Sequence, residues 1–354
     1  MAVYKIFPTK DATLYSEFPN MNTGLDAIIE ASTYLRLGVP QTSRYLIQFS
    51  TTEIQSVVDD VITSTNFSAS LKNSAAVVDS LNLDSQLEIK TISGSWGMGT
   101  GKYGDSPEIT NGCSWNWRSY SGSNAWVTAG GDVHSSPVYS QSFAYSDPID
   151  VSVNVTPTIL SWYSGGKFAN KNEGFLIKQP DAVELVQNPN VVSTFKYFSI
   201  DTNTIYPPFL EFGWDDSTYN TGSSTNTVLT TSETFMSIYN NVGEYYPESV
   251  ARMRLAAIPK YPDRVFQTSS LYTTNYYLPE TTSLYAIKDS ETNEFVVDFD
   301  SDFTKISADE TSSFFDIYMN GLEPERYYTV LIKTRLDGTI QVYDEDIMFK
   351  VING

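Results

Sequence analysis

Apolar and polar residues alternate with a period of two along much of the first 215 residues of this chain. The alternating segments are 34–37, 44–49, 85–92, 148–155 and 174–178. Such alternation predicts β-strands that turn one face toward a core and the other toward water or a neighbour. Two sheets packed face to face would accommodate all of these strands. We therefore expect a β-sandwich over residues 1–215.

Two segments depart from the alternation. Residues 51–60 have apolar positions spaced as on a helix and a Thr-x-x-Glu-like start, which predicts a short amphipathic helix that caps the sandwich. Residues 93–147 are rich in Gly, Ser and Trp and poor in aliphatic residues. We interpret this second segment as a long, ordered loop excursion from one end of the sandwich.

The pattern changes after residue 215. Residues 215–226 are small and polar, so we place a boundary there and expect 216–265 to be a linker with bridging strands or a small β-domain. Further along, short strands recur about every ten residues, which is typical of an immunoglobulin-like sandwich over 266–354. These strands are expected at 276–278, 284–288, 295–299, 314–319, 327–333 and 340–343.

Composition supports an all-β chain. Aromatic residues make up 14% of the sequence, and 20 Gly and 16 Pro suit short strands joined by turns. A chain of 354 residues ordinarily divides into two or three units that each bury a core. The predicted fold is an N-terminal jelly-roll-like β-sandwich followed by one or two immunoglobulin/fibronectin-III-like sandwiches.

Charge and termini restrict the partners and the compartment. The formal net charge of −20 disfavours nucleic acid and anionic membrane surfaces, which require a basic face. No apolar run is long enough to span a membrane, and the first residues lack the apolar core of a secretory signal. The single Cys113 excludes an internal disulfide. We expect synthesis and folding in a cytoplasm.

Candidate chemistry is sparse, so we predict no catalytic residues, no metal and no cofactor. The only histidine, His134, lies in a turn-rich stretch without a nucleophile elbow, and one His with one Cys cannot build a zinc cluster.

The series Asp298, Asp300 and Asp302 imitates a calcium loop but has Phe303 where Gly is needed, and a strand with a solvated acidic face explains it better. The Gly-rich run 96–104 precedes no helix that would receive a phosphate. Among the many acids, no pair is singled out for glycoside hydrolysis.

An aromatic group within the excursion is the candidate binding surface: Trp96, Trp115, Trp117, Trp126, Tyr103 and Tyr120. Three interpretations stay open. The rings pack the loop onto the sandwich, anchor a protein interface, or stack on sugar rings.

The order of short phrases along the first 215 residues resembles the β-sandwich modules called DNRLRE domains, a group within the jelly-roll, carbohydrate-binding-like folds. The phrases lie at 11–16, 20–24, 43–50, 95–97, 111–115, 126, 154–156, 162–165, 172–177 and 207–212. In that family an early Asp-Ala begins the first strand and an Asn-x-Gly turn follows, as do Asp11-Ala12 and Asn22-Thr23-Gly24 here.

A second resemblance concerns the remaining residues. Residues 252–266, 285–289 and 318–328 resemble structural proteins of tailed bacteriophages, particularly T4-like phages of marine bacteria. Within this part, residues 321–332 resemble the late strand of fibronectin type III modules, in which a Gly-Leu-x-Pro turn precedes a Tyr-containing strand.

Together the resemblances imply a non-enzymatic virion component of the tail, neck, baseplate or fibre, assembled in the host cytoplasm. Its partners would be other virion proteins, in a symmetric homo-oligomer within the particle. Two alternatives remain: a carbohydrate-binding module that adsorbs to host surface glycans, or a glycan depolymerase.

Overall fold

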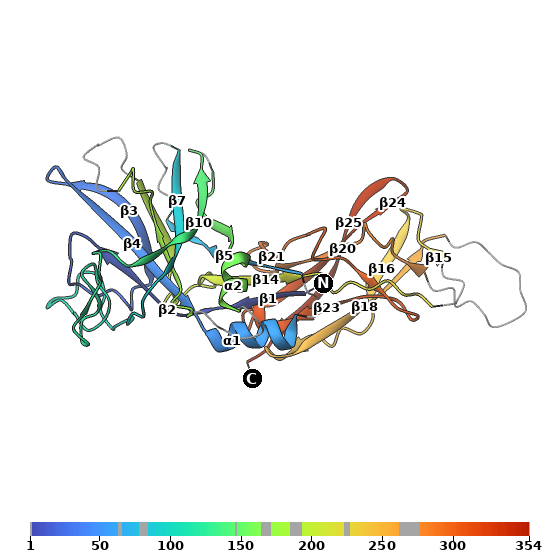
Figure 1. Ribbon diagram of the computed structural model, residues 1–354. Coiled ribbons are helices and arrows are strands. Elements are labelled where there is room, and N and C mark those ends of the chain that lie inside the picture. Colours follow the sequence, from blue (N-terminus) through green and yellow to red (C-terminus); the bar gives the residue numbers. More distant parts are fainter. Residues whose placement is uncertain are drawn as a thin grey trace, which may run out of the picture. The chain divides into compact units, whose positions relative to one another are not determined.

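The computed structural model describes residues 2–62, 66–77, 84–145, 147–163, 171–184, 193–222, 227–261 and 276–353 (Figure 1). Among the described residues, strand accounts for 48% and helix for 7%, which confirms the predicted all-β fold. The chain forms two compact units. The N-terminal unit comprises 6–61 and 68–211, and the C-terminal unit comprises 1–5, 62–67 and 212–354.

The N-terminal unit contains a large antiparallel sheet with the strand order β10-β7-β12-β4-β3-β13-β6 and with β2 also paired to β4. Its strands are β2 (Pro8–Tyr15), β3 (Ile28–Arg36), β4 (Val39–Phe49), β6 (Ala75–Val77), β7 (Ser85–Ile92), β10 (Val133–Phe143), β12 (Phe175–Lys178) and β13 (Ser193–Phe198). A second sheet has the order β1-β14-β5-β11, formed by β1 (Ala2–Ile6), β14 (Phe209–Trp214), β5 (Phe67–Asn73) and β11 (Val151–Asn154). The predicted segments 44–49, 85–92 and 174–178 fall on β4, β7 and β12, and 148–155 contains β11. Segment 34–37 overlaps only the last three residues of β3 and ends in the turn that follows it.

Alternation along the strands places the core between these sheets. On β7, Leu87 and Ile89 are buried on the inner face, and Phe175 and Ile177 of β12 lie on the same side. The amide of Asn73 on β5 donates to the Tyr45 hydroxyl on β4 over 2.6 Å. This buried hydrogen bond joins one sheet to the other inside an otherwise apolar core.

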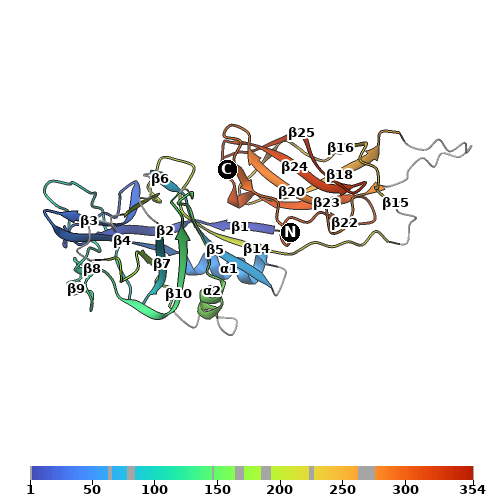
Figure 2. The same cartoon turned by 90° about the horizontal axis from the view of Figure 1, so that it is seen from above.

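The outer face of the large sheet also carries apolar residues, and the excursion covers them. Ala12, Leu14, Leu46, Ile92 and Leu176 form one cluster with Trp96, Cys113, Trp115 and Trp126. Within the excursion, β8 (Trp117–Ser119) pairs with β9 (Asn124–Ala125) (Figure 2). The excursion is thus a second core layer.

The excursion is shorter than the expected 93–147. Residues 133–143 form β10, which pairs with β7 along the edge of the large sheet. β10 is mostly Ser, Gln and other polar residues, and ten of its eleven residues are at least partly exposed. Such a polar edge strand lacks the apolar alternation by which the sequence reveals a strand.

Two short helices accompany the N-terminal unit. The predicted helix is present as α1 (Thr51–Ser56), which continues as a π-helical turn over Val57–Val61. Its N-cap is Ser50, whose hydroxyl accepts the backbone N–H of Glu53 at 3.3 Å. The second helix, α2 (Thr156–Trp162), was not predicted; Pro157 lies in its first turn, and Ile159 and Trp162 are buried.

The C-terminal unit has the strand order of an immunoglobulin-like sandwich. One sheet is β16-β18-β23-β22 and the other is β17-β25-β24-β20-β21, which correspond to the ABED and GFC sheets of that fold. The strands are β16 (Thr234–Ile238), β17 (Glu244–Tyr245), β18 (Val250–Pro259), β20 (Leu284–Asp289), β21 (Phe295–Val297), β22 (Ser307–Ala308), β23 (Ser313–Tyr318), β24 (Tyr327–Leu336) and β25 (Thr339–Val351). A 3-10 turn, Met319–Gly321, follows β23, and β15 (Thr227–Val228) pairs in parallel with β19 (Tyr276–Tyr277).

The segment 216–265, expected to be a linker with bridging strands or a small β-domain, supplies β15 to β18 of this unit. Met253 and Leu255 of β18 belong to the same buried cluster as Phe315 of β23 and Tyr285 of β20. Since β18 is a central strand of this core, the sandwich includes residues well before 266. The expected boundary between 265 and 266 lies outside the described residues.

The late-strand phrase that resembles fibronectin type III modules has a structural counterpart. The hydroxyl of Tyr328, at the start of β24, donates to the carbonyl oxygen of Glu323 over 3.0 Å. A tyrosine that bonds back to the backbone before this strand is the tyrosine corner of immunoglobulin-like folds. It holds the connection between β23 and β24 against the core.

Candidate functional site

Three of the six predicted aromatic residues are buried. Trp96, Trp115 and Trp126 are only 4%, 9% and 5% exposed. The indole N–H groups of Trp96 and Trp126 donate to the carbonyl oxygens of Glu173 and Ser114, each at 2.9 Å. These rings pack the excursion onto the sheet, so none of the three presents a flat face to a sugar or to a neighbouring chain.

The other three aromatic residues keep exposed edges. Trp117 donates its indole N–H to Asn20 Oδ1 at 3.0 Å and meets Tyr120 edge to face, with an interplanar angle of 79°. Tyr103 is more than half exposed and contacts the Tyr15 ring, with centroids 5.1 Å apart. Because the Trp117 and Tyr120 rings are nearly perpendicular, they form no common plane for stacking.

Asn22 fixes the path of the excursion. Its side-chain N–H groups donate to the carbonyl oxygens of Met98 and Cys113 at 2.6 and 2.8 Å, and its Oδ1 accepts the N–H of Gly101 at 2.8 Å. Burial raises the pKa of the Cys113 thiol to about 12, so the thiol stays protonated and unreactive at neutral pH. The Asn-x-Gly phrase of the sequence is therefore structural.

A cavity of about 480 Å³ opens beside this second core layer. Its floor comes from the outer faces of three neighbouring strands, with Arg44 on β4, Lys90 on β7 and Leu176 and Lys178 on β12. The remaining lining residues are Ser93, Val127, Thr128, Gly131, Asp132, Val133 and Asp181. The volume is within the usual range for small-molecule sites.

An ion-pair network supports the cavity floor. Arg44 pairs in a bidentate manner with Glu184, at 3.1 and 2.6 Å, and its guanidinium lies 5.0 Å from the centroid of the Trp115 ring. The Lys178 ammonium pairs with Glu184 at 3.2 Å and with Asp181. Since Lys178 and Glu184 are both nearly fully buried, each charge depends on the others for compensation.

The three cations of the cavity affect the pKa of Asp181, a carboxylate at its rim. Lys178 lowers the pKa of Asp181 below its ordinary value, and Lys90 and Arg44 add to the effect. The Asp181 side chain is nevertheless 81% exposed, so it pairs with Lys178 while it faces solvent. No sequence pattern indicates this site, because its cations come from three separate strands that look like ordinary alternating segments.

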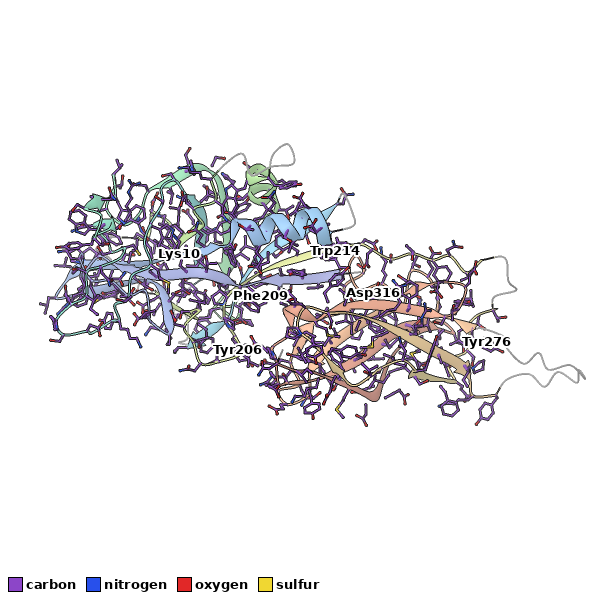
Figure 3. All side chains as sticks on the ribbon, turned by 90° about the horizontal axis from the view of Figure 1, so that it is seen from below. Lys10, Tyr206, Phe209, Trp214, Tyr276 and Asp316 are labelled. Atoms are coloured by element: carbon purple, nitrogen blue, oxygen red, sulfur yellow. The ribbon has the colours of Figure 1, made fainter. Side chains whose placement is uncertain are left out.

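A second surface lies on the C-terminal unit: the outer face of β16, β18 and β23, called here the β16–β18–β23 face. Its outward residues are Phe235, Ser237, Val250, Arg252, Arg254, Ala256, Ile258, Phe314, Asp316 and Tyr318, and Asp316 can be followed in Figure 3. Phe235 and Ile258 are direct cross-strand partners and are 57% and 52% exposed. None of these outward positions is Lys or Glu.

The two arginines of this face stack on one ring. The guanidinium groups of Arg252 and Arg254 lie 4.2 and 5.6 Å from the centroid of the Phe314 ring. Arg252 pairs in a bidentate manner with Asp316 at 2.8 and 2.9 Å, and Arg254 likewise with Asp309 at 3.0 and 2.8 Å. Arg254 lowers the pKa of Asp309 to about 2, so this pair stays charged at any physiological pH.

The acidic series after β21 forms a turn, where the sequence predicted a strand edge. β21 ends at Val297, and Asp300 Oδ1 accepts the backbone N–H groups of Asp302 and Phe303 at 2.7 and 2.9 Å. A local side-chain bond of this kind competes with a strand ladder. Over the ranges that the structure describes, no group of three or more His, Cys, Asp or Glu is arranged to hold a metal ion.

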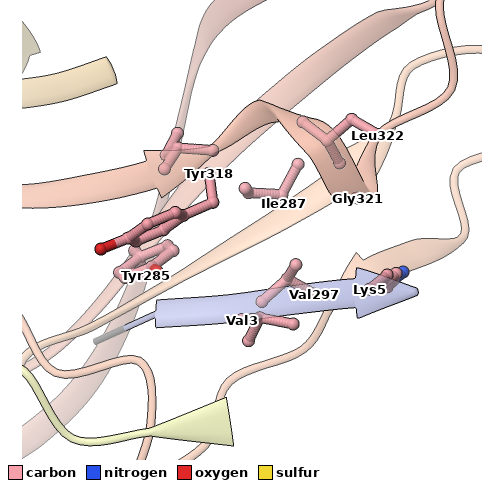
Figure 4. Close-up of a pocket in the computed structure, with 9 residues that line it drawn as sticks. Val3, Lys5, Tyr285, Ile287, Val297, Tyr318, Gly321 and Leu322 are labelled. Carbon is pink, nitrogen blue, oxygen red and sulfur yellow. The ribbon is translucent and has the colours of Figure 1, made fainter. Parts of the chain in front are cut away.

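The C-terminal unit also contains a very small cavity. In the C-terminal unit, Val3 and Lys5 line a cavity with Tyr285, Ile287 and Val297 (Figure 4), and the Lys5 ammonium donates to the Val296 carbonyl at 3.1 Å. At about 10 Å³ this cavity holds at most one water molecule. Among the described helices, none is long and apolar enough to cross a membrane.

These observations define an all-β protein with two candidate surfaces, a charged cavity and an apolar, arginine-containing sheet face. No protein-family model and no curated protein matches the chain. Among solved structures, it is similar to a DUF4785 family protein from Legionella pneumophila, with 8% sequence identity and a TM-score of 0.18. That alignment covers 98% of this chain and 65% of the other, so the chain spans less than two thirds of that protein's length.

Proposed function

We propose that this chain is a non-enzymatic structural component of a tailed bacteriophage virion that assembles through protein–protein contacts. The proposal of a phage particle rests on the sequence resemblances over residues 252–266, 285–289 and 318–328. The proposal of assembly through protein–protein contacts rests on the β16–β18–β23 face. A neighbouring subunit within the particle is its proposed partner, in a symmetric homo-oligomer.

The composition of the β16–β18–β23 face carries the proposal. Aromatic residues and Arg are enriched at protein interfaces, and this face carries three aromatic residues and two arginines. It also carries Ser237, Ala256 and Asp316, which are residue types that interfaces contain less often. Exposing Phe235 and Ile258 as a cross-strand pair leaves apolar area in water that a partner would cover. Because both arginines are already paired with carboxylates, covering them would leave no uncompensated charge.

The buried tryptophans favour a rigid structural unit over an exposed sugar-binding surface. Trp96, Trp115 and Trp126 stiffen the N-terminal unit by adding a second core layer. A rigid unit loses little conformational freedom when it docks, which favours stable assembly.

The test is incorporation into particles. Phe235→Ser and Ile258→Ser remove the exposed apolar pair without touching the core, and Ile340→Ser removes an equally exposed apolar side chain on β25 as the matched control. We expect mass spectrometry of purified virions to detect the wild-type chain and the control, and at least tenfold less of the two interface variants. Wild-type levels of all three variants would remove the β16–β18–β23 face as the assembly surface, and absence of the wild-type chain would refute the virion role.

A further inference from the structure

We propose that the free edge of β16 pairs with β16 of a second copy of this chain, antiparallel about a two-fold axis. This contact rests on the proposed function, because it gives the homo-oligomer a specific geometry. It is made by the backbone at the edge of the sheet, whereas the proposed function uses the β16–β18–β23 face. Each surface can therefore be tested separately from the other.

The backbone of β16 bonds to β18 at every second residue. Just before the strand, the carbonyl oxygen of Glu233 accepts the N–H of Lys260 at 2.9 Å. Just after it, the N–H of Tyr239 donates to the carbonyl oxygen of Arg254 at 3.2 Å. The register between these two bonds is unbroken, and backbone groups alternate in direction along an antiparallel ladder. The odd-numbered residues from 233 to 239 therefore face β18.

The backbone N–H and C=O groups of Thr234, Met236 and Ile238 consequently point to the other side of β16. Among the described strands, β16 pairs with β18 alone. β25 of the opposite sheet lies close to the start of β16, where the Tyr343 hydroxyl donates to the Ser232 carbonyl over 3.4 Å, but it forms no ladder with β16. These three residues are thus a row of donors and acceptors to which another strand can be added.

The other sheet edges of the C-terminal unit are protected, and β16 is not. β22 has two residues, and the N–H of Ala308 is already bonded to the carbonyl oxygen of Thr218 at 2.8 Å. β21 has three residues between Glu294 and Asp298, and β25 carries the acidic residues 344–346. β16 has five residues without a charge, a proline or a break in register. In a chain of net charge −20, this edge is the place where two copies can meet without local repulsion.

A two-fold axis at Met236 uses all of the outward backbone groups. It places Met236 opposite the partner's Met236 and Thr234 opposite the partner's Ile238. These are hydrogen-bonded pairs that exchange two bonds each, so the contact contains about six hydrogen bonds. An axis one residue away would pair one of the outward residues with a residue outside β16. The geometry of the strand therefore selects one register.

This register also joins the exposed apolar side chains of two copies. Phe235 lies opposite the partner's Ser237, and the two Phe235 rings are diagonal neighbours, about 7–8 Å apart between their backbones, which is within reach of aromatic side chains. The side chains of Thr234 and Met236 are already buried on the inner face, so pairing leaves the core unchanged. The two four-stranded sheets become one, and the Phe235–Ile258 pairs of both copies lie on the same surface.

The first experiment is sedimentation velocity of the purified full chain over a range of concentrations. Ser237→Glu puts two like charges about 7–8 Å apart across the axis. Ala256→Glu is the matched control, because Ala256 is the cross-strand partner of Ser237 on β18 and gains the same charge one strand away from the edge. We expect dimers of the wild type and of the control with equal Kd. Dimers of Ser237→Glu should be at least tenfold weaker, about 1.4 kcal/mol or more, with unchanged circular dichroism.

The alternative outcomes separate this contact from the proposed function. A wild-type chain that stays monomeric would overturn the β16 contact and leave the virion role to the incorporation test. Equal weakening by both variants would mean that the copies meet through the β16–β18–β23 face, which overturns the edge contact and retains the proposed function. Dimers that neither variant weakens would place the contact elsewhere and would also overturn it.

Disulfide cross-linking tests the register. Phe235 and the partner's Ser237 would form a non-hydrogen-bonded pair with Cα atoms about 4.5 Å apart, which is within the range for a disulfide. We expect an oxidised mixture of Phe235→Cys and Ser237→Cys to form at least tenfold more covalent dimer than either variant alone, as measured by mass spectrometry. The native Cys113 is buried and should not react. Equal cross-linking in the mixture and in the separate variants would refute pairing about Met236.

Discussion

At the residue scale, the most consequential buried group is Asp11. Its side chain is 1% exposed, Oδ2 accepts the N–H of Ile200 at 2.8 Å, and Oδ1 has no hydrogen-bond partner among the described residues. Burial, with smaller contributions from Asp201 and Asp26, raises the pKa of Asp11 to about 7. The Asp11-Ala12 phrase at the start of the chain therefore places a carboxyl group where its charge is costly.

This pKa predicts a specific pH dependence of stability. The folded protein holds the Asp11 proton to about pH 7, whereas the unfolded chain releases it near its ordinary value of 3.8. Stability should therefore fall as the pH rises from about 4 to about 7, and then level off. Asp11→Asn keeps an acceptor for Ile200 and cannot ionise, so at pH 8 it should exceed the wild type by up to about 4 kcal/mol, at 1.36 kcal/mol per pKa unit.

Urea unfolding at pH 5 and pH 8 measures this effect. Glu108→Gln, which removes an exposed carboxylate from the same unit, should keep the wild-type pH profile. A profile of Asp11→Asn that parallels the wild type would show that the Asp11 charge is compensated in the folded state.

Tyr328 gives a second prediction at this scale. Tyr328→Phe removes the hydroxyl that bonds to Glu323 and should lower the free energy of unfolding of the C-terminal unit by about 1 kcal/mol. The adjacent Tyr327 is half exposed on β24, so Tyr327→Phe is a matched control that should have little effect. Equal unfolding free energies for the Tyr328 variant and the wild type, from urea denaturation, would contradict a tyrosine corner that stabilises the fold.

At the element scale, two hairpins with the same turn geometry differ in sequence. The β3–β4 hairpin turns at Leu37-Gly38, with φ angles of 50° and 79°, and the β24–β25 hairpin turns at Asp337-Gly338, with 49° and 72°. Positive φ at both central residues defines the type I′ turn, which prefers Asn or Asp at its first position. Leu37 departs from this preference and is 99% exposed, so its side chain gains nothing from burial.

Exchanging turn residues between the hairpins should change stability in opposite directions. Leu37→Asn should stabilise the N-terminal unit by about 1 kcal/mol, since Asn tolerates the left-handed conformation that costs Leu about that amount. Asp337→Leu should destabilise the C-terminal unit by a similar amount for the same reason. Thermal unfolding of both variants measures the two shifts. A destabilised Leu37→Asn would mean that Leu37 contributes a contact at this tip.

Elements with strong period-two alternation were predictable from the sequence, and those without it were not. Residues 85–92 were predicted as a strand and form β7, and 284–288 fall within β20. β10 was missed because its exposed edge is polar, and Asp298 to Asp302 was predicted as a strand although side-chain bonding of Asp300 makes it a turn. The cavity could not be predicted, because Arg44, Lys90 and Lys178 meet only through the pairing of β4, β12 and β7.

At the scale of the whole molecule, the two sandwich units present different surfaces. The N-terminal unit buries its tryptophans and presents a charged cavity, whereas the C-terminal unit exposes an apolar face with two paired arginines. A net charge of −20 opposes nonspecific association between copies, so stable assembly requires a specific contact that is locally neutral. The β16–β18–β23 face has this property.

A cryo-EM map of the intact particle, in which this chain is located, would test assembly through the β16–β18–β23 face. We expect the chain to be part of the virion, with Phe235, Ile258 and the guanidinium groups of Arg252 and Arg254 buried against a neighbouring subunit. A map in which this face lies open to solvent, or particles that lack the chain, would contradict it.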